Sequence, residues 1–284
     1  MSRDKDSNRT RKIHREVSKL FNQALEPDPF SLHRLRKEAE QLATEEPIAT
    51  SLILARISCM EHQPGAMETF YKQLINQNPA HPQTHLEYGL SLRKLGFYSE
   101  ARERTRKAME LDGDHPGVIQ QMIRDCILSG RFNEAGDFLK QAVRASLPIY
   151  RAQFHFLESV QDLLNQHKVV DDEIEMMQQC AVDLLREHHL YPSGILRAPA
   201  VHIELTTDGE EPVSDTFGGT PSHAWLRWRI HLHQPIERVE SLNTLLAQRL
   251  ASQEQLPATL PQQVDMAYAL WREGVINMPF GFYM

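Results

Sequence analysis

Two adjacent stretches decide the fold of this chain: PQTHLEYGLSLRKLGFYSEARERTRKAMELDGDH at residues 82–115 and PGVIQQMIRDCILSGRFNEAGDFLKQAVRASLPI at residues 116–149. Both begin with proline, and both have the apolar spacing of two helices separated by a glycine. The matching positions, each 34 residues apart, are Gly96 and Gly130, Tyr98 and Phe132, Ala101 and Ala135, and Ala108 and Ala142. Such a period indicates a repeated helix pair.

The period and its residue types resemble the tetratricopeptide-repeat (TPR) family. In that family, small residues such as Gly89 let the two helices of a pair approach closely, a glycine such as Gly96 supplies the turn, and an aromatic residue such as Tyr98 fills the space between pairs. A looser copy, IATSLILARISCMEHQPGAMETFYKQLINQNPAH, precedes them at residues 48–81. The resemblance implies a stack of antiparallel helix pairs.

Helical spacing continues on both sides of these copies, at residues 10–25 and 30–44 and again at residues 149–166 and 171–189. Five pairs predict a mainly α protein whose TPR-like repeat domain, residues 13–190, forms a short, curved, right-handed solenoid. Residues 1–12 precede it and are predicted to form a flexible basic arm.

Near Tyr191 the helical period ends and strand-like alternation begins. AVHIELTTD and WLRWRIHLH, at residues 200–208 and 225–233, predict two half-buried strands. Pro235 is expected to open an amphipathic helix, followed by a helix at about residues 262–272 and a last strand in VINMPFGFYM. We therefore expect a small α+β domain at residues 191–284, analogous in element order to a ferredoxin-like sandwich without its first strand.

The composition argues against several classes of protein. The net charge is −7, from 31 basic and 38 acidic residues, so nothing attracts the whole chain to nucleic acid or to an anionic membrane. Three separated cysteines suit a reducing compartment. Neither a secretory leader nor a stretch of about 18 apolar residues is found. The sequence predicts a soluble, cytoplasmic protein without a membrane partner, and nucleic acid is not the expected partner.

The first helix of each TPR pair lines the inner wall of the solenoid, which is the usual binding groove. The resemblance places these candidate peptide-binding residues on the wall: Arg56, Leu86, Leu90, Arg93, Lys94, Gln120 and Arg124. Basic groups among aliphatic ones suit an acidic or carboxylate-ended segment. The alternative is that these charges are solvated or paired within the chain. Side chains of this wall are expected not to pack between helices.

The clearest candidate for metal chemistry is His202-x-Glu204 on one predicted strand with His231-x-His233 on the other. Side chains at i and i+2 share a strand face, so the four groups form a ligand set suited to zinc or iron. The alternative is a solvated sheet face in which Glu204 pairs with Arg227 or Arg229. We predict no metal and no cofactor.

The leading interpretation is a scaffold or adaptor that holds a peptide or protein segment in the groove of the repeats. One alternative is an enzyme with a metal or acid/base site in the α+β domain, acting on a substrate recruited by the repeats. No catalytic sequence motif is present, and no catalytic residue is assigned. A second alternative is a nucleic-acid-associated regulator that uses the basic residues between Arg3 and Lys19.

Overall fold

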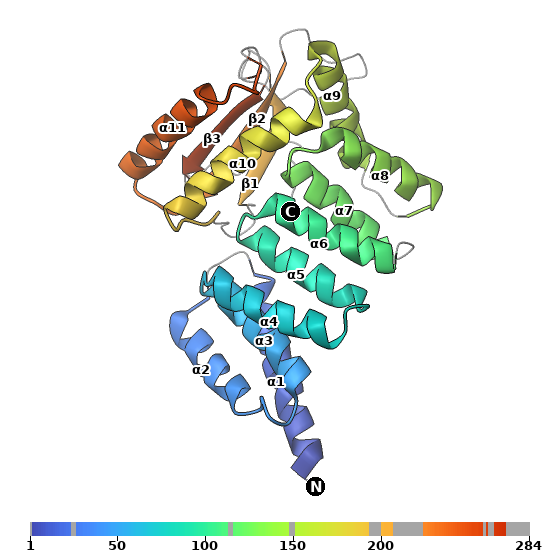
Figure 1. Ribbon diagram of the computed structural model, residues 1–284, viewed down its shortest axis with the longest axis vertical. Coiled ribbons are helices and arrows are strands. Elements are labelled where there is room, and N and C mark those ends of the chain that lie inside the picture. Colours follow the sequence, from blue (N-terminus) through green and yellow to red (C-terminus); the bar gives the residue numbers. More distant parts are fainter. Residues whose placement is uncertain are drawn as a thin grey trace. The chain divides into compact units, whose positions relative to one another are not determined.

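The computed structural model describes residues 2–23, 27–112, 116–147, 151–192, 200–206, 224–257, 260 and 264–270, with the backbone alone at residues 2–7, 151–153 and 270. The chain divides into two compact units, Met1–Gly113 and Asp114–Met284. In the described ranges it is mainly α-helical, with a small three-stranded sheet near the carboxyl end (Figure 1). No helix in these ranges is long and apolar enough to cross a membrane.

The first unit is a series of helices that pack on their neighbours in the sequence. Proline occupies the first turn of four of them, where its missing N–H costs nothing and its fixed φ suits the helix. Figure 1 shows α3–α4 and α5–α6 as successive hairpins. The helices are α1 (Ser2–Phe21), α2 (Pro29–Glu40), α3 (Pro47–Met60), α4 (Pro64–Gln77), α5 (Pro82–Lys94) and α6 (Tyr98–Leu111).

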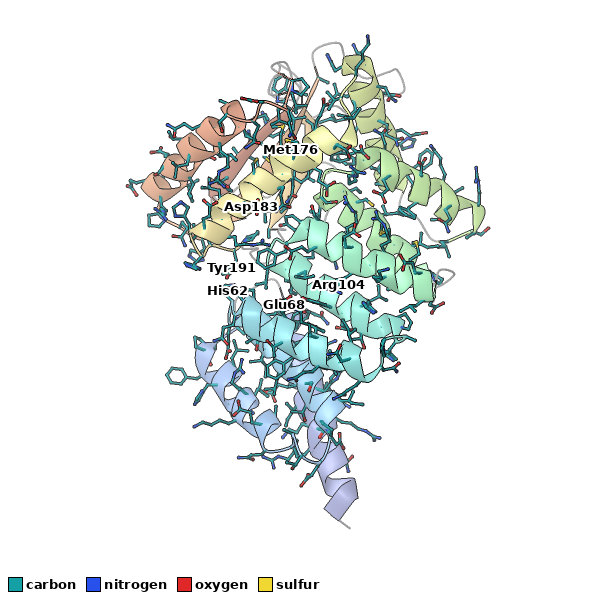
Figure 2. The ribbon with its side chains drawn as sticks, in the orientation of Figure 1. His62, Glu68, Arg104, Met176, Asp183 and Tyr191 are labelled. Carbon is teal, nitrogen blue, oxygen red and sulfur yellow. The ribbon has the colours of Figure 1, made fainter. Side chains whose placement is uncertain are left out.

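The turns inside successive pairs repeat in detail. His62, Gly96 and Gly130 follow the first helix of their pairs at intervals of 34 residues, with φ of 56°, 84° and 84°. The residue after each donates its N–H to a carbonyl five residues earlier, at 2.8, 2.9 and 2.8 Å. This left-handed helix ending favours glycine, and the predicted turns at Gly96 and Gly130 are confirmed. His62, labelled in Figure 2, adopts the same conformation without glycine.

Small residues bring α5 and α6 together as predicted. A Cβ added to Gly89 would lie 3.1 Å from both the Ala101 carbonyl oxygen and Thr105 Oγ1. Ala101 and Ala108 are fully buried. Between α4 and α5, the rings of Tyr71 and Tyr88 stack with centroids 4.7 Å apart.

The amino-terminal helix belongs to the core of the first unit. Its buried residues Ile13 and Val17 pack with apolar side chains of α2 and α3. Because α1 begins at Ser2, it also includes the residues assigned from the sequence to a basic arm. The apolar cluster consists of Ile13, Val17, Leu32, Leu35, Ala39, Leu42, Ile53, Leu54 and Ile57.

The second unit combines helix pairs with the sheet. Its elements are α7 (Pro116–Leu128), α8 (Phe132–Arg144), α9 (Arg151–His167), α10 (Asp171–Glu187), β1 (Val201–Thr206), β2 (Trp225–Leu232), α11 (Ile236–Ala251) and β3 (Val264–Leu270). The strand order is β1-β2-β3, with β1 antiparallel and β3 parallel to β2. The helix α11 therefore forms the crossover that a parallel pair requires.

The sheet and the preceding helices share one core. The buried Trp228 ring of β2 meets the Phe132 ring of α8 edge to face, with centroids 6.0 Å apart. The Tyr268 hydroxyl of β3 donates to the Ala181 carbonyl of α10 at 2.6 Å. The side chain of Asn243, from α11, accepts from the Tyr268 N–H and donates to the Tyr268 carbonyl. This contact satisfies backbone groups on the outer edge of β3.

The predicted helix at residues 262–272 is wrong, because residues 264–270 form β3. Burial alternates along this strand, with Val264, Met266 and Tyr268 on the covered face. A short apolar run with two alanines fits a helix as well as a strand, and pairing with β2 decides the outcome. The strand predicted at VINMPFGFYM lies outside the described residues. The predicted domain limits at residues 12 and 190 stay predictions.

Candidate functional site

The predicted groove residues fall on three helices. In the first unit, Arg56 lies on α3, whereas Leu86, Leu90, Arg93 and Lys94 all lie on α5. Leu86, Leu90 and Arg93 are half-buried, and Lys94 is exposed. In the second unit, Gln120 and Arg124 lie on α7, the former exposed and the latter half-buried. The α5 residues therefore form a mixed apolar and basic face on a single helix.

Arg56 is enclosed, with 7 % of its surface exposed. Its Nε and Nη2 donate to Glu87 Oε2 of α5 at 3.2 and 2.6 Å, and its Nη1 donates to Ser18 Oγ of α1 at 2.6 Å. The same Nη1 lies 3.4 Å from His14 Nε2. The expectation that wall side chains do not pack between helices is therefore wrong for Arg56, which joins α1, α3 and α5.

Lys94 also meets α1. Its Nζ lies over the Phe21 ring, 4.9 Å from the centroid, and the Arg56 guanidinium lies 5.6 Å from the same centroid. Lys94 is exposed as a whole residue, but its ammonium is desolvated where it meets α1, and this desolvation lowers the pKa of the ammonium from its ordinary value. The last turn of α1 thus covers part of the surface that was assigned to a ligand, and cation–π attraction holds both cations against it.

A hollow of about 490 Å³ opens between α1 and the start of α3. Most of its lining residues carry a polar group, and it extends to His14 and Ser18, the residues that contact Arg56. The lining residues are Thr10, Arg11, His14, Arg15 and Ser18 of α1 together with Glu46 and Ala49 at the start of α3. It is an open depression of the surface and not an enclosed cavity.

Two arginines in this hollow differ from the other arginines of the unit. Arg11 and Arg15 are exposed and one helical turn apart, and neither has a hydrogen-bond or ion-pair partner among the described residues. Between them, His14 has its pKa lowered by burial and then by the charge of Arg56, although Glu87 raises it. At neutral pH His14 is therefore uncharged, and the lining carries two positive charges against the single negative charge of Glu46.

Sequence reasoning missed this hollow. Arg11 and Arg15 were grouped with the basic residues between Arg3 and Lys19, and no groove residue was assigned to α1. The signal was the spacing of Arg11, His14, Arg15 and Ser18, which are i, i+3, i+4 and i+7 of one helix and so share a face. What the spacing alone does not reveal is which helix packs beside that face.

The metal candidates lie on the polar face of the sheet. In the antiparallel register His202 is opposite Arg229, and Glu204 is opposite Arg227. Arg227 Nη1 donates to Glu204 Oε1 at 3.2 Å, as the structural alternative anticipated, and His202 Nε2 lies 3.6 Å from Glu204 Oε2. Glu204 is therefore shared between a guanidinium and an imidazole.

The remaining candidates do not complete a ligand set. His231 is buried, and its pKa is lowered to about 4 by desolvation and by the neighbouring His202 and Arg229. His233 is exposed and follows the end of β2. Arg229 pairs with Asp265 of β3. Within the described ranges, no group of three or more His, Cys, Asp or Glu side chains is arranged to hold a metal ion. The enzyme alternative for this domain stays a prediction.

A scan against protein-family models finds no match for this chain, and a search of curated proteins finds none either. The repeated turns, the α5 face and the hollow beside α1 are therefore the basis for assigning a function.

Proposed function

We propose that this protein is a TPR-like scaffold or adaptor that binds a peptide segment of a partner protein along the first helices of its repeats. The observation that carries the proposal is the repeated turn at His62, Gly96 and Gly130, with a left-handed backbone conformation and the same hydrogen bond every 34 residues. A period of this length, with close helix pairs, is the pattern of the TPR solenoid. We infer the right-handed curvature of that solenoid from the same likeness.

The α5 helix supplies the central part of the proposed groove. Leu86 and Leu90 are one turn apart and half-buried, so each retains apolar surface for a ligand side chain. Arg93 and Lys94 follow at the carboxyl end of the same helix. An apolar anchor beside cations suits a peptide with an acidic or carboxylate end. Arg56 serves this groove by positioning Glu87 and α1, since its own guanidinium is enclosed.

For the second unit we propose a ferredoxin-like arrangement without the first strand. That fold has the order β-α-β-β-α-β. Removing its first strand leaves a helix, an antiparallel strand pair, a second helix and a final strand. The order α10, β1, β2, α11, β3 and the antiparallel pair β1–β2 follow that description, whereas β3 here pairs directly with β2 in parallel, with no strand between them. The two helices also pack on each other.

Selection of peptides by the protein itself tests the scaffold proposal. The full chain is immobilised, dodecapeptides are selected from a displayed library, and their affinity is measured for the Leu86→Ser, Leu90→Ser double variant. Loss of two apolar anchors of about 1–2 kcal/mol each should weaken binding by about thirtyfold or more. Leu111→Ser, at an exposed leucine of α6, is the matched control and should bind as the parent does.

Two results would count against the scaffold. One is a library that yields no specific peptide. The other is a set of selected peptides that bind the double variant as tightly as the parent. If the double variant does not fold, hydrogen exchange of the parent protein decides, because bound peptide should protect α5 and leave the far end of α6 unchanged.

A further inference from the structure

We propose that the hollow between α1 and α3 binds an extended acidic segment of a partner protein, whose carboxylates at positions i and i+2 pair with Arg11 and Arg15. This inference rests on the proposed scaffold function. It adds a second contact surface to the α5 face and states the chemistry that the partner must present there.

The first step is that some described arginines of the first unit have a hydrogen-bond or ion-pair partner, whereas Arg11 and Arg15 do not have one among the described residues. Arg11 and Arg15 are like charges one turn apart, an arrangement that destabilises a helix. Neither side chain has a hydrogen-bond or ion-pair partner in the part of the chain that the structure describes. Partners are found elsewhere: Arg9 has Gln41, Arg34 has Glu16, Arg36 has Glu61 and Arg56 has Glu87.

The second step is the spacing of the two charges. Residues i and i+4 of a helix are separated by about 6 Å along the axis, since each residue rises about 1.5 Å. Residues i and i+2 of an extended strand are separated by about 6.6 Å and point to the same side. An extended Glu-x-Glu segment along α1 therefore presents one carboxylate to Arg11 and one to Arg15. Adjacent glutamates point to opposite sides and reach one arginine at most.

The third step decides between a short acidic peptide and nucleic acid. The lining has a net charge of about +1, because Glu46 opposes the two arginines and the lowered pKa of His14 keeps it neutral. Nucleic-acid affinity is dominated by contacts with many phosphates, on the order of 6–10 in a strongly salt-dependent binder. Two guanidinium groups match two carboxylates, each of which can accept a bidentate hydrogen-bond pair. The number of charges in the hollow therefore suits a short acidic peptide better than a nucleic acid.

Two synthetic peptides of equal composition provide the test, one with a central Glu-Ser-Glu and the other with Glu-Glu-Ser. Each is titrated into the full-length protein, and binding is followed by NMR chemical shifts of α1 and α3 amides. We expect the alternating peptide to bind about fivefold more tightly than the adjacent one, the equivalent of one exposed ion pair. Arg11→Ala and Arg15→Ala should each remove that preference.

Matched variants distinguish binding at this site from nonspecific electrostatic attraction between the acidic peptide and basic side chains of the protein. Lys12→Ala removes the same charge from an exposed neighbour outside the lining and should leave the preference for the alternating peptide intact. Glu46→Gln removes the opposing charge and should tighten binding of the alternating peptide. A twelve-nucleotide single-stranded DNA serves as the nucleic-acid arm and should bind no better than the alternating peptide.

Equal affinity for the two peptides, equal losses in Arg11→Ala and Lys12→Ala, or tighter binding of the DNA would overturn the inference. Each of these results leaves the scaffold proposal standing if library peptides still require Leu86 and Leu90. The converse result is also distinguishable. If the alternating peptide shifts the NMR signals of α1 and α3 amides, but no library peptide depends on Leu86 and Leu90, the result supports this site and rejects the α5 groove.

Discussion

The charges beside α1 and those on the polar face of the sheet look alike in the sequence but differ in the structure. On the sheet, Arg227 faces Glu204 and Arg229 pairs with Asp265, so each guanidinium is matched by a carboxylate. Beside α1, Arg56 is enclosed with Glu87, whereas Arg11 and Arg15 face an open hollow. A charge pattern therefore indicates a binding site only after the pairs inside the protein have been identified.

The largest effect that this comparison predicts concerns the enclosed pair. Glu87→Ala should lower the free energy of unfolding by about 3 kcal/mol, because it leaves the Arg56 guanidinium buried without its carboxylate. Urea denaturation measures the loss. The double variant Arg56→Met, Glu87→Leu should recover much of the stability, since no unpaired charge then remains. A Glu87→Ala protein as stable as the parent would show that Arg56 is not enclosed.

The next effect is acid sensitivity of the sheet. The pKa of His231 is about 4 in the folded protein and 6.5 in the unfolded chain. Between these values the unfolded chain binds the proton and the folded protein does not, so stability is fully present above pH 6.5 and falls as the pH falls toward 4. The loss should be about 3 kcal/mol. It is measured by urea denaturation at several pH values.

His231→Leu supplies the control for this pH dependence. Its stability should fall less steeply between pH 6.5 and 4, because the proton that the unfolded parent takes up at His231 is absent. Part of the slope should remain, since burial also lowers the pKa of His202, His14 and His85. Identical slopes for the parent and His231→Leu would contradict the assignment.

A smaller effect is expected for the pair across β1 and β2. Glu204 and Arg227 are only partly enclosed, with 18 % and 31 % of their side chains exposed, so solvent weakens their attraction. A double-mutant cycle with Glu204→Gln and Arg227→Met should give a coupling energy of about 0.5–1 kcal/mol. A coupling near zero would mean that the sheet face is as open as the hollow beside α1.

The smallest effect on stability belongs to the open arginines. Arg11→Ala and Arg15→Ala should each leave the free energy of unfolding within about 0.5 kcal/mol of the parent value, because neither guanidinium contacts a partner in the described chain. Thermal melts of both variants and of Lys12→Ala check this. A marked destabilisation by Arg11→Ala alone would place that side chain in the fold rather than in a binding surface.

The repeat turns were predictable because their cause is local. Gly96 and Gly130 adopt a left-handed backbone that glycine tolerates best, so the residue type marks the turn. His62 adopts the same conformation although it is not a glycine. The turn in the looser copy at residues 48–81 was therefore the hardest of the three to predict from the sequence. Close packing at Gly89 and Ala101 was likewise evident from residue size and period.

The errors arose where two parts of the chain had to meet. Residues 264–270 carry a pattern that suits either a helix or a strand, and the backbone hydrogen bonds of β2 select the strand. Arg56 occupies a position that the family pattern assigns to the groove, but the carboxylate of Glu87 and the hydroxyl of Ser18 enclose it. Neither partner is within 30 residues of Arg56 in the sequence.

The sequence by itself determined the helix pairs, their 34-residue period and the small residues at which they approach, because these depend on backbone preference and side-chain size within one pair. Tertiary structure alone decided which charges remain available to a ligand. The energy of an ionic group depends on what surrounds it, and those surroundings come from helices distant in the chain. Arg56 and Arg15 are both arginines on helical faces, yet only Arg15 lines the hollow without a partner among the described residues.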